Sequence, residues 1–203
     1  MGIQDIDSAW TGHYDFARWL VNKMKPKVCV DLGVYHGFST FTLASLGYGT
    51  VYAIDNFSIK RSYEKFIDNM IALDISNVEV IYSDFNEVEW DKQIDILHID
   101  GNHHYEYVRE DFDKWAKFAK VVLLHDVFNP CFEGPIRVVK EEIGNYHVTI
   151  LEPSQGLGVL TKDLSLYQSI LKENNLPEII GINYGAFDGE QFLEIVEKKT
   201  EGV

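Results

Sequence analysis

Short apolar runs alternate with longer segments in which apolar residues recur every three or four positions, from about residue 13 to residue 160. Such runs predict buried strands, and the recurring spacing predicts helices with one apolar face. Strands are predicted at 28–30, 50–54, 78–82, 94–99 and 121–124, and helices at 13–24, 37–45, 63–71, 105–115 and 135–143. This alternation predicts an α/β fold with a Rossmann-like, doubly wound, mostly parallel sheet.

The C-terminal part of the chain has a different pattern. Apolar runs at 148–150 and 157–160 lie too close together for a crossover helix, so they predict an antiparallel hairpin that completes a seven-stranded sheet. Residues 164–203 are predicted to form two helices on either side of Leu176-Pro177. We therefore expect one domain at residues 1–162, with residues 163–203 packed on it as a helical C-terminal extension.

An acidic residue follows or ends each of the first five predicted strands. These residues are Asp31, Asp55, Asp84, Asp100 and Asp126. The carboxyl ends of parallel strands share one edge of a sheet, and ligands of open α/β folds bind at that edge. Acids scattered by chance would not select one end of one sheet, so this pattern predicts a ligand crevice lined by carboxylates.

The turn after the first strand contains Gly33 and Gly37, which allow a sharp turn and close approach of a ligand. The spacing is G-x-x-x-G rather than the dinucleotide fingerprint G-x-G-x-x-G, which disfavours a pyrophosphate cradle. Asp31 at the start of the turn suits a cationic ligand. Asp55, 24 residues further on, occupies a position that commonly holds ribose hydroxyls. S-adenosylmethionine has both a ribose and a cationic amino-acid group.

Composition narrows the classes of partner. The 203 residues include 18 Lys and Arg against 32 Asp and Glu, a net charge of −14, which argues against nucleic acid or a membrane surface as the main partner. No apolar stretch approaches the roughly 18 residues of a membrane helix, and the N-terminus does not resemble a signal peptide, so a cytoplasmic location is expected. Cys29 and Cys131 are too few for a disulfide framework or a Cys-rich zinc site.

Several segments together carry a family resemblance. They are VCVDLGVYHGFS at 28–39, AIDN at 53–56, IYSD at 81–84, LHIDGNHHYE at 97–106 and LHD at 124–126. Over about residues 13–162 the chain resembles class I S-adenosylmethionine-dependent methyltransferases. The I-D-G-x-H-x-Y-E motif with its downstream H-D is similar to the subgroup that contains macrocin-type sugar and small-molecule O-methyltransferases, and the glycine turn is similar to catechol-type O-methyltransferases.

The resemblance implies roles for individual residues. The implied cofactor-binding residues are Asp31, Gly33, Gly37 and Ser39 at the methionine end, Asp55 and Asn56 at the ribose, and Asp84 and Phe85 at the adenine, together with Asp100. In metal-dependent relatives, acids after the fourth and fifth strands bind a divalent ion, which implies a site at Asp100, His125 and Asp126. His125 stands where an acid is common, and Mg²⁺ prefers oxygen ligands, so the identity of the cation stays open.

Methyl transfer to an alcohol requires a base or a metal ion that lowers the pKa of the hydroxyl. His103, three residues after Asp100, is the predicted base, and Asp100 is the second predicted catalytic residue. There are simpler interpretations. His103 and His104 could be surface residues at the start of a helix, and His98, inside a strand, could be a histidine packed in the core.

The leading hypothesis is an S-adenosylmethionine-dependent O-methyltransferase that acts on a small hydroxylated molecule such as a sugar or glycoside, with Mg²⁺ or another divalent cation as an additional cofactor. The expected partner is the small-molecule acceptor, and a homo-oligomer is left open. Two alternatives remain. One is a nicotinamide-dependent oxidoreductase, and the other is a non-catalytic module that binds a metabolite on the same fold.

Overall fold

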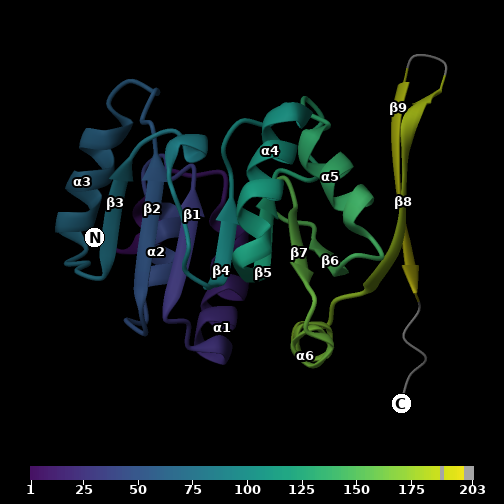
Figure 1. Cartoon of the computed structure of the whole chain (residues 1–203), viewed down its shortest axis with the longest axis horizontal. Coiled ribbons are helices and arrows are strands. Elements are labelled where there is room, and N and C mark those ends of the chain that lie inside the picture. The colour runs from purple at the N-terminus through teal and green to yellow at the C-terminus, as the bar shows by residue number, and fades with distance from the viewer. Residues whose placement is uncertain (188–189, 199–203) are drawn as a thin grey trace.

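The computed structural model describes residues 1–187 and 190–198. Its centre is a mixed sheet with the strand order β3-β2-β1-β4-β5-β7-β6-β8-β9 (Figure 1). The first five strands in sequence are parallel, and they are β1 (Val28–Leu32), β2 (Thr50–Asp55), β3 (Val78–Tyr82), β4 (Ile94–Ile99) and β5 (Ala119–His125). The order reverses between β1 and β4, which is the switch point where ligands of doubly wound folds bind.

Helices cover both faces of the sheet. The helices α1 (Tyr14–Met24), α2 (Phe38–Ala44), α3 (Ser62–Ala72) and α6 (Leu164–Asn174) contribute to the apolar core on one face. The helices α4 (Tyr105–Trp115) and α5 (Gly134–Glu142) contribute to the core on the other. The predicted α/β fold with a mostly parallel sheet is therefore confirmed. No helix in the described part of the chain combines the length and apolar character needed to span a membrane.

The predicted antiparallel hairpin is formed by β6 (His147–Leu151) and β7 (Leu157–Thr161), with β7 placed against β5. The sheet then continues into β8 (Glu178–Phe187) and β9 (Glu190–Lys198), which form a second hairpin. Figure 1 shows this hairpin at the end of the sheet opposite β3.

The prediction of a seven-stranded sheet with a wholly helical C-terminal extension was wrong. One of the two predicted helices exists, as α6, but the second is replaced by β8 and β9. A register shift lies between Ile179 and Gly181, and Ile179 and Ile182 are both buried. Such a bulge gives strand residues the three-residue spacing of a helix face. The β-branched residues and Gly181 nevertheless favour a strand over a helix.

Candidate functional site

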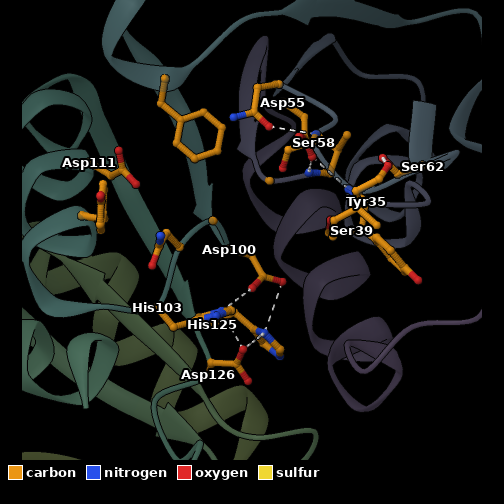
Figure 2. Close-up of a pocket in the computed structure, with 18 of the residues that line it drawn as sticks. Tyr35, Ser39, Asp55, Ser58, Ser62, Asp100, His103, Asp111, His125 and Asp126 are labelled. Carbon is orange, nitrogen blue, oxygen red and sulfur yellow. Dashed lines mark hydrogen bonds and ion pairs between the residues drawn. The ribbon is translucent and has the colours of Figure 1, made fainter. Parts of the chain in front are cut away.

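A cavity of about 1000 Å³ lies at the carboxyl ends of the parallel strands. Its wall is built from the loops that follow β1 to β5, with residues 8–10 of the N-terminal segment along one side. Four of the five predicted acids line the cavity, namely Asp55, Asp84, Asp100 and Asp126. The predicted crevice at this edge of the sheet therefore exists, and Figure 2 shows its polar side chains directed toward a common space.

Asp31 is the predicted acid that does not line the cavity. It is fully buried, where its carboxylate accepts hydrogen bonds from Ser39 Oγ at 2.8 Å and Thr40 Oγ1 at 2.5 Å. His98 Nδ1 contacts the other carboxylate oxygen at 2.7 Å, while Trp10 Nε1 donates to His98 Nε2 at 2.9 Å. The Trp10 bond fixes the tautomer in which His98 Nδ1–H donates to Asp31. Asp31 thus orients Ser39 and Trp10, which do line the cavity.

The glycine turn is fixed by close packing. Gly33 has φ +87°, and a Cβ atom there would lie 2.1 Å from the carbonyl oxygen of Asp100. Gly37 has φ +93°, and a Cβ atom there would lie 2.2 Å from the ring of Phe41. Gly33 lines the cavity, whereas Gly37 lies behind it at the start of α2. Both positions require glycine because of backbone conformation and space.

Asp55 holds the same turn in place from β2. Its carboxylate accepts hydrogen bonds from the backbone N–H groups of Val34 at 2.9 Å, Tyr35 at 3.3 Å and Phe57 at 2.6 Å. A carboxylate has about four lone-pair positions, so one remains on Oδ1 for a ligand hydroxyl. The structure therefore leaves Asp55 able to contact a ligand while it orders the loop.

The predicted adenine end combines a polar pair with an aromatic ring. Asn56 Nδ2 donates to Asp84 Oδ1 at 2.5 Å and thereby connects the ends of β2 and β3. Phe85 is half-buried, and its ring lies so close to Gly101 that a Cβ atom there would approach it to 2.5 Å. A flat apolar surface therefore stands beside hydrogen-bonding groups, which suits a heteroaromatic ring.

The opposite end of the cavity holds a compact cluster of two acids and two histidines. His103 Nε2 lies 2.7 Å from Asp126 Oδ2 and 3.2 Å from Asp100 Oδ1. His125 Nδ1 lies 3.2 Å from Asp100 Oδ2 and 3.7 Å from Asp126 Oδ2. The end of β5 and the loops after β4 and β5 bring these four residues together, as the sequence predicted for the ends of neighbouring strands (Figure 2).

The charges in this cluster shift one another's pKa values. Burial lowers the pKa of His103, but hydrogen bonds to Asp100 and Asp126 outweigh it and raise the pKa to about 9. The pKa of His125 is also raised, by the same two carboxylates against the effect of burial. Burial opposes ionisation of Asp100, yet the neighbouring imidazoles hold its pKa well below its usual range. Both histidines are therefore stabilised in their protonated forms.

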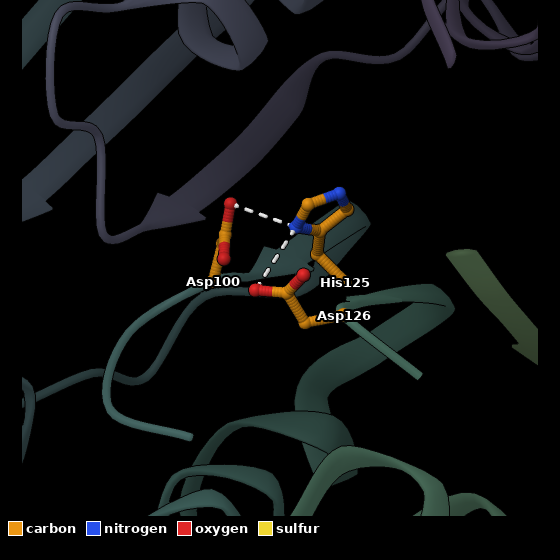
Figure 3. A group of neighbouring side chains, drawn as sticks. All are labelled: Asp100, His125 and Asp126. Atoms are coloured by element: carbon orange, nitrogen blue, oxygen red, sulfur yellow. Dashed lines mark ion pairs between the residues drawn. The ribbon is translucent and has the colours of Figure 1, made fainter. Parts of the chain in front are cut away.

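The geometry of His125 fits a metal ligand. Its Nε2–H donates to the carbonyl oxygen of Ser154 at 2.8 Å, so Nδ1 is the atom that faces the two carboxylates (Figure 3). Nδ1 is buried, and its charged neighbours are Asp100 Oδ2 at 3.2 Å and Asp126 Oδ2 at 3.7 Å. Potential ligand atoms of Asp100, His125 and Asp126 all lie within 4.8 Å of one another. Two oxygens and one nitrogen suit a divalent ion such as Mn²⁺ or Zn²⁺ better than Mg²⁺.

Sequence reasoning missed the contribution of the N-terminal segment. Trp10 lines the cavity, and His13 is fully buried with its ring 5.3 Å from that of His125. Burial and the neighbouring His125 lower the pKa of His13 to about 3, so it is neutral at physiological pH. Neither residue belongs to a strand end or a recognisable motif, and only the folded chain brings them to the site.

Part of the chain resembles known proteins in sequence. Residues 30–127 match a family described as a methyltransferase domain. An uncharacterized protein from Sinorhizobium fredii is 30% identical over 141 residues, which are 60% of this chain and 15% of that protein. The chain therefore spans only a small part of the length of this curated relative.

Solved structures share the fold. An O-methyltransferase from Bacillus cereus, in complex with S-adenosylhomocysteine, has a TM-score of 0.58 at 16% identity, covering 74% of this chain and 81% of that one. A candidate caffeoyl-CoA O-methyltransferase from Staphylococcus aureus has a TM-score of 0.60 at 16% identity, covering 78% and 85%. The chain therefore has the Rossmann-like methyltransferase fold.

Proposed function

We propose that this protein is an S-adenosylmethionine-dependent methyltransferase that methylates an oxygen of a small hydroxylated molecule, such as a sugar or glycoside. The observation that carries the proposal is the contact of His103 with both Asp100 and Asp126 at one end of the cavity. These three residues lie within the segment 30–127 that matches the methyltransferase domain. The macrocin-type subgroup is part of this proposal because of the motif at 97–106.

The cofactor would extend along the carboxyl edge of the sheet. In this proposal, Gly33 and Ser39 contact the methionine part, Asp55 contacts the ribose, and Asp84 with Phe85 contacts the adenine. All five line the same cavity. This arrangement would direct the sulfonium methyl group toward the cluster around His103.

His103 would act on the acceptor as the base. Its Nε2 would accept the proton of the acceptor hydroxyl, while the bound cofactor would supply the methyl group to the acceptor oxygen and would leave as S-adenosylhomocysteine. The raised pKa keeps His103 protonated at neutral pH while both carboxylates face it. A cation held by Asp100 and Asp126 would withdraw this stabilisation from the His103 imidazolium and so would lower the pKa of His103.

Asp100, His125 and Asp126 would hold a divalent cation in this proposal. Such a cation supplies a positive charge that lowers the pKa of an acceptor hydroxyl. The Ser154 carbonyl keeps His125 Nδ1 turned toward both carboxylates. Asp126 has φ +60°, a strained conformation of the kind often found at functional sites.

The charged side chains that line the cavity favour an acceptor without phosphate groups. Among the described residues that line it, none is Lys or Arg. The carboxylates that line it are Asp55, Asp84, Glu87, Asp100, Asp111 and Asp126. Phosphate recognition ordinarily uses Arg or Lys side chains, so this wall suits a neutral polyol or phenol better than a coenzyme A thioester.

The proposal is tested by measuring S-adenosylhomocysteine formation from S-adenosylmethionine over a panel of sugars, glycosides and phenols. We expect turnover with at least one hydroxylated acceptor, reduced by about 100-fold or more in His103→Gln. His147→Gln is the matched control, since His147 lies on β6 and does not line the cavity. Turnover that survives in His103→Gln would contradict the role of His103. Cofactor binding without turnover across the panel would favour the non-catalytic module.

The cation site has a separate test. Calorimetric titration of the chelator-treated protein with MnCl₂ should give one saturable site in the wild type and a loss of about tenfold or more in affinity in Asp126→Asn. An exposed acid outside the cavity, Asp91, provides the control Asp91→Asn. Equal affinity in Asp126→Asn and the control would contradict the proposed ligand set.

A further inference from the structure

The cavity carries more negative charge than the proposed cofactor and cation would neutralise. Of the described residues that line it, six are Asp or Glu and none is Lys or Arg. S-adenosylmethionine has a single net positive charge, because its sulfonium and ammonium groups are opposed by one carboxylate. Together with a divalent cation, it would neutralise only about half of these acids. A cleft lined by one sign of charge concentrates molecules of the opposite sign.

The wall of the cavity beside the proposed base is aromatic. The half-buried ring of Phe132 lies 5.4 Å from the ring of His103 and 5.5 Å from that of His104. Tyr107, in the first turn of α4, also lines the cavity and is 53% exposed. The loop after β5 packs tightly here, since a Cβ atom at Gly134 would lie 2.3 Å from the carbonyl oxygen of His103. Aromatic surfaces therefore stand where an acceptor must bind to reach the base.

Asp111 places a carboxylate next to this aromatic wall. It lies one helical turn after Tyr107 on α4, and residues four apart on a helix are neighbours on one face. Asp111 lines the cavity and is 4% exposed. Figure 2 shows it on the same side of the cavity as His103, across from Asp55 and Ser39. Burial raises its pKa to about 7, so a positive charge beside it would stabilise its ionised form.

We propose that the methyl acceptor carries an ammonium group, which binds at the carboxylate of Asp111 and the ring of Tyr107 while the acceptor hydroxyl faces His103. This inference rests on the proposed function, because the acceptor is the polyol or phenol proposed above with a protonated amino group attached. Aromatic faces attract organic ammonium ions, and a carboxylate accepts their charge-assisted hydrogen bonds. Among the described lining residues, no Lys or Arg competes for this position.

The test uses pairs of probes that share their hydroxyl groups and differ in charge. The pairs are D-glucosamine with N-acetyl-D-glucosamine, and tyramine with N-acetyltyramine. The formation of S-adenosylhomocysteine by the full chain gives kcat/KM for each probe, and NMR of the product shows whether oxygen or nitrogen is methylated. We expect O-methylation of the amine in at least one pair, with kcat/KM about tenfold or more above that of its N-acetyl partner.

Substitutions show whether Asp111 and Tyr107 cause the preference. Asp111→Asn should narrow the ratio of amine to N-acetyl probe by about fivefold or more, because it removes the negative charge. Tyr107→Leu should narrow it by about threefold, whereas Tyr107→Phe should keep it, since the aromatic face remains. Glu106→Gln, an exposed position on the same helix outside the cavity, should leave the ratio unchanged. The affinity for S-adenosylhomocysteine should stay within about threefold of the wild type in all four variants.

The outcomes separate the two proposals. If the wild type does not bind S-adenosylhomocysteine, or if it methylates nitrogen, both the proposed function and this inference fail. If the wild type O-methylates neutral acceptors but shows no preference for the amines, or rejects all four probes, only this inference is overturned. The same holds if folded Asp111→Asn keeps the full ratio, or loses affinity for S-adenosylhomocysteine instead. The wild-type ratio requires no substitution, so it decides the question even if Asp111→Asn does not fold.

Discussion

At the scale of single residues, the carboxylates at the edge of this sheet differ in role because their partners differ. Asp31 is buried and bonded to Ser39, Thr40 and His98, so it orders the wall from behind. Asp55 accepts a hydrogen bond from the backbone of the turn after β1 and also lines the cavity. Asp126 faces a histidine pair. The same residue type therefore serves as a buried support, as a cavity-lining acceptor of backbone N–H groups or as part of a charged cluster.

Replacing Asp55 by Ala should weaken the binding of S-adenosylhomocysteine by about tenfold or more, because it removes a ligand contact and leaves two turn N–H groups without their acceptor. Calorimetric titration measures the affinity. Asp91→Ala, on an exposed loop, is the control. An unchanged dissociation constant in folded Asp55→Ala would count against the proposed path of the cofactor.

The raised pKa of His103 predicts a pH dependence of stability in chelator-treated protein. Because its folded pKa of about 9 exceeds 6.5, its contribution is complete below pH 6.5 and is lost as the pH rises through 9. The difference in unfolding free energy between wild type and His103→Gln should therefore shrink by about 1–3 kcal/mol over this interval. Denaturant titrations at several pH values measure it, and a constant difference would contradict the two-carboxylate environment.

The sequence predicted the acids at the strand ends because each of them follows or ends one of the apolar runs that predict the parallel strands. It did not predict that Asp31 lies behind the cavity, since the side-chain direction at a strand terminus depends on tertiary contacts with His98 and Ser39. The sequence did not single out Asp111, because the other buried residues on its face of α4 are apolar. Trp10 comes from a segment without any periodic pattern.

At the scale of elements, the turn after β1 controls the shape of the site. Hydrogen bonds from Gly33 N to Ile54 O, and from Asp100 N to Leu32 O, join this turn to the ends of β2 and β4. Gly33 also touches the backbone of Asp100. A displacement of this turn would therefore move the acid that contacts both histidines of the cluster.

Gly33→Ala should destabilise the protein by about 3 kcal/mol or more, because it combines a positive φ with a clash against the Asp100 backbone. Gly47→Ala is the matched control, since Gly47 has φ +66° but a Cβ atom there would meet nothing within 4 Å. That control should cost about 1 kcal/mol. Denaturant unfolding measures both, and equal losses would show that the contact with Asp100 is unimportant.

At the scale of the whole molecule, the β8–β9 hairpin and the cavity lie in different parts of the sheet. The cavity is built on β1 to β5, and the hairpin is attached beyond β6 through the pairing of Val148 with Ile179 (Figure 1). None of the described hairpin residues lines the cavity. The extension therefore contributes to the fold without shaping the described site.

Ending the chain after Pro177 removes buried Ile179 and Ile182, each worth about 1.5–3 kcal/mol, so the midpoint of thermal unfolding should fall. The affinity for S-adenosylhomocysteine in the folded fraction should stay within about threefold of the wild type, a difference below about 0.7 kcal/mol. Thermal unfolding and calorimetry measure the two effects. A large loss of affinity in folded, shortened protein would mean that the extension reaches the site.

The central claim is that the cavity at the carboxyl edge of this sheet binds S-adenosylmethionine. Calorimetric titration of the wild-type chain with S-adenosylhomocysteine tests it most directly. We predict saturable binding of one molecule per chain, with a dissociation constant on the order of micromolar, about −8 kcal/mol. Absence of saturable binding up to millimolar ligand, in protein shown to be folded, would contradict it.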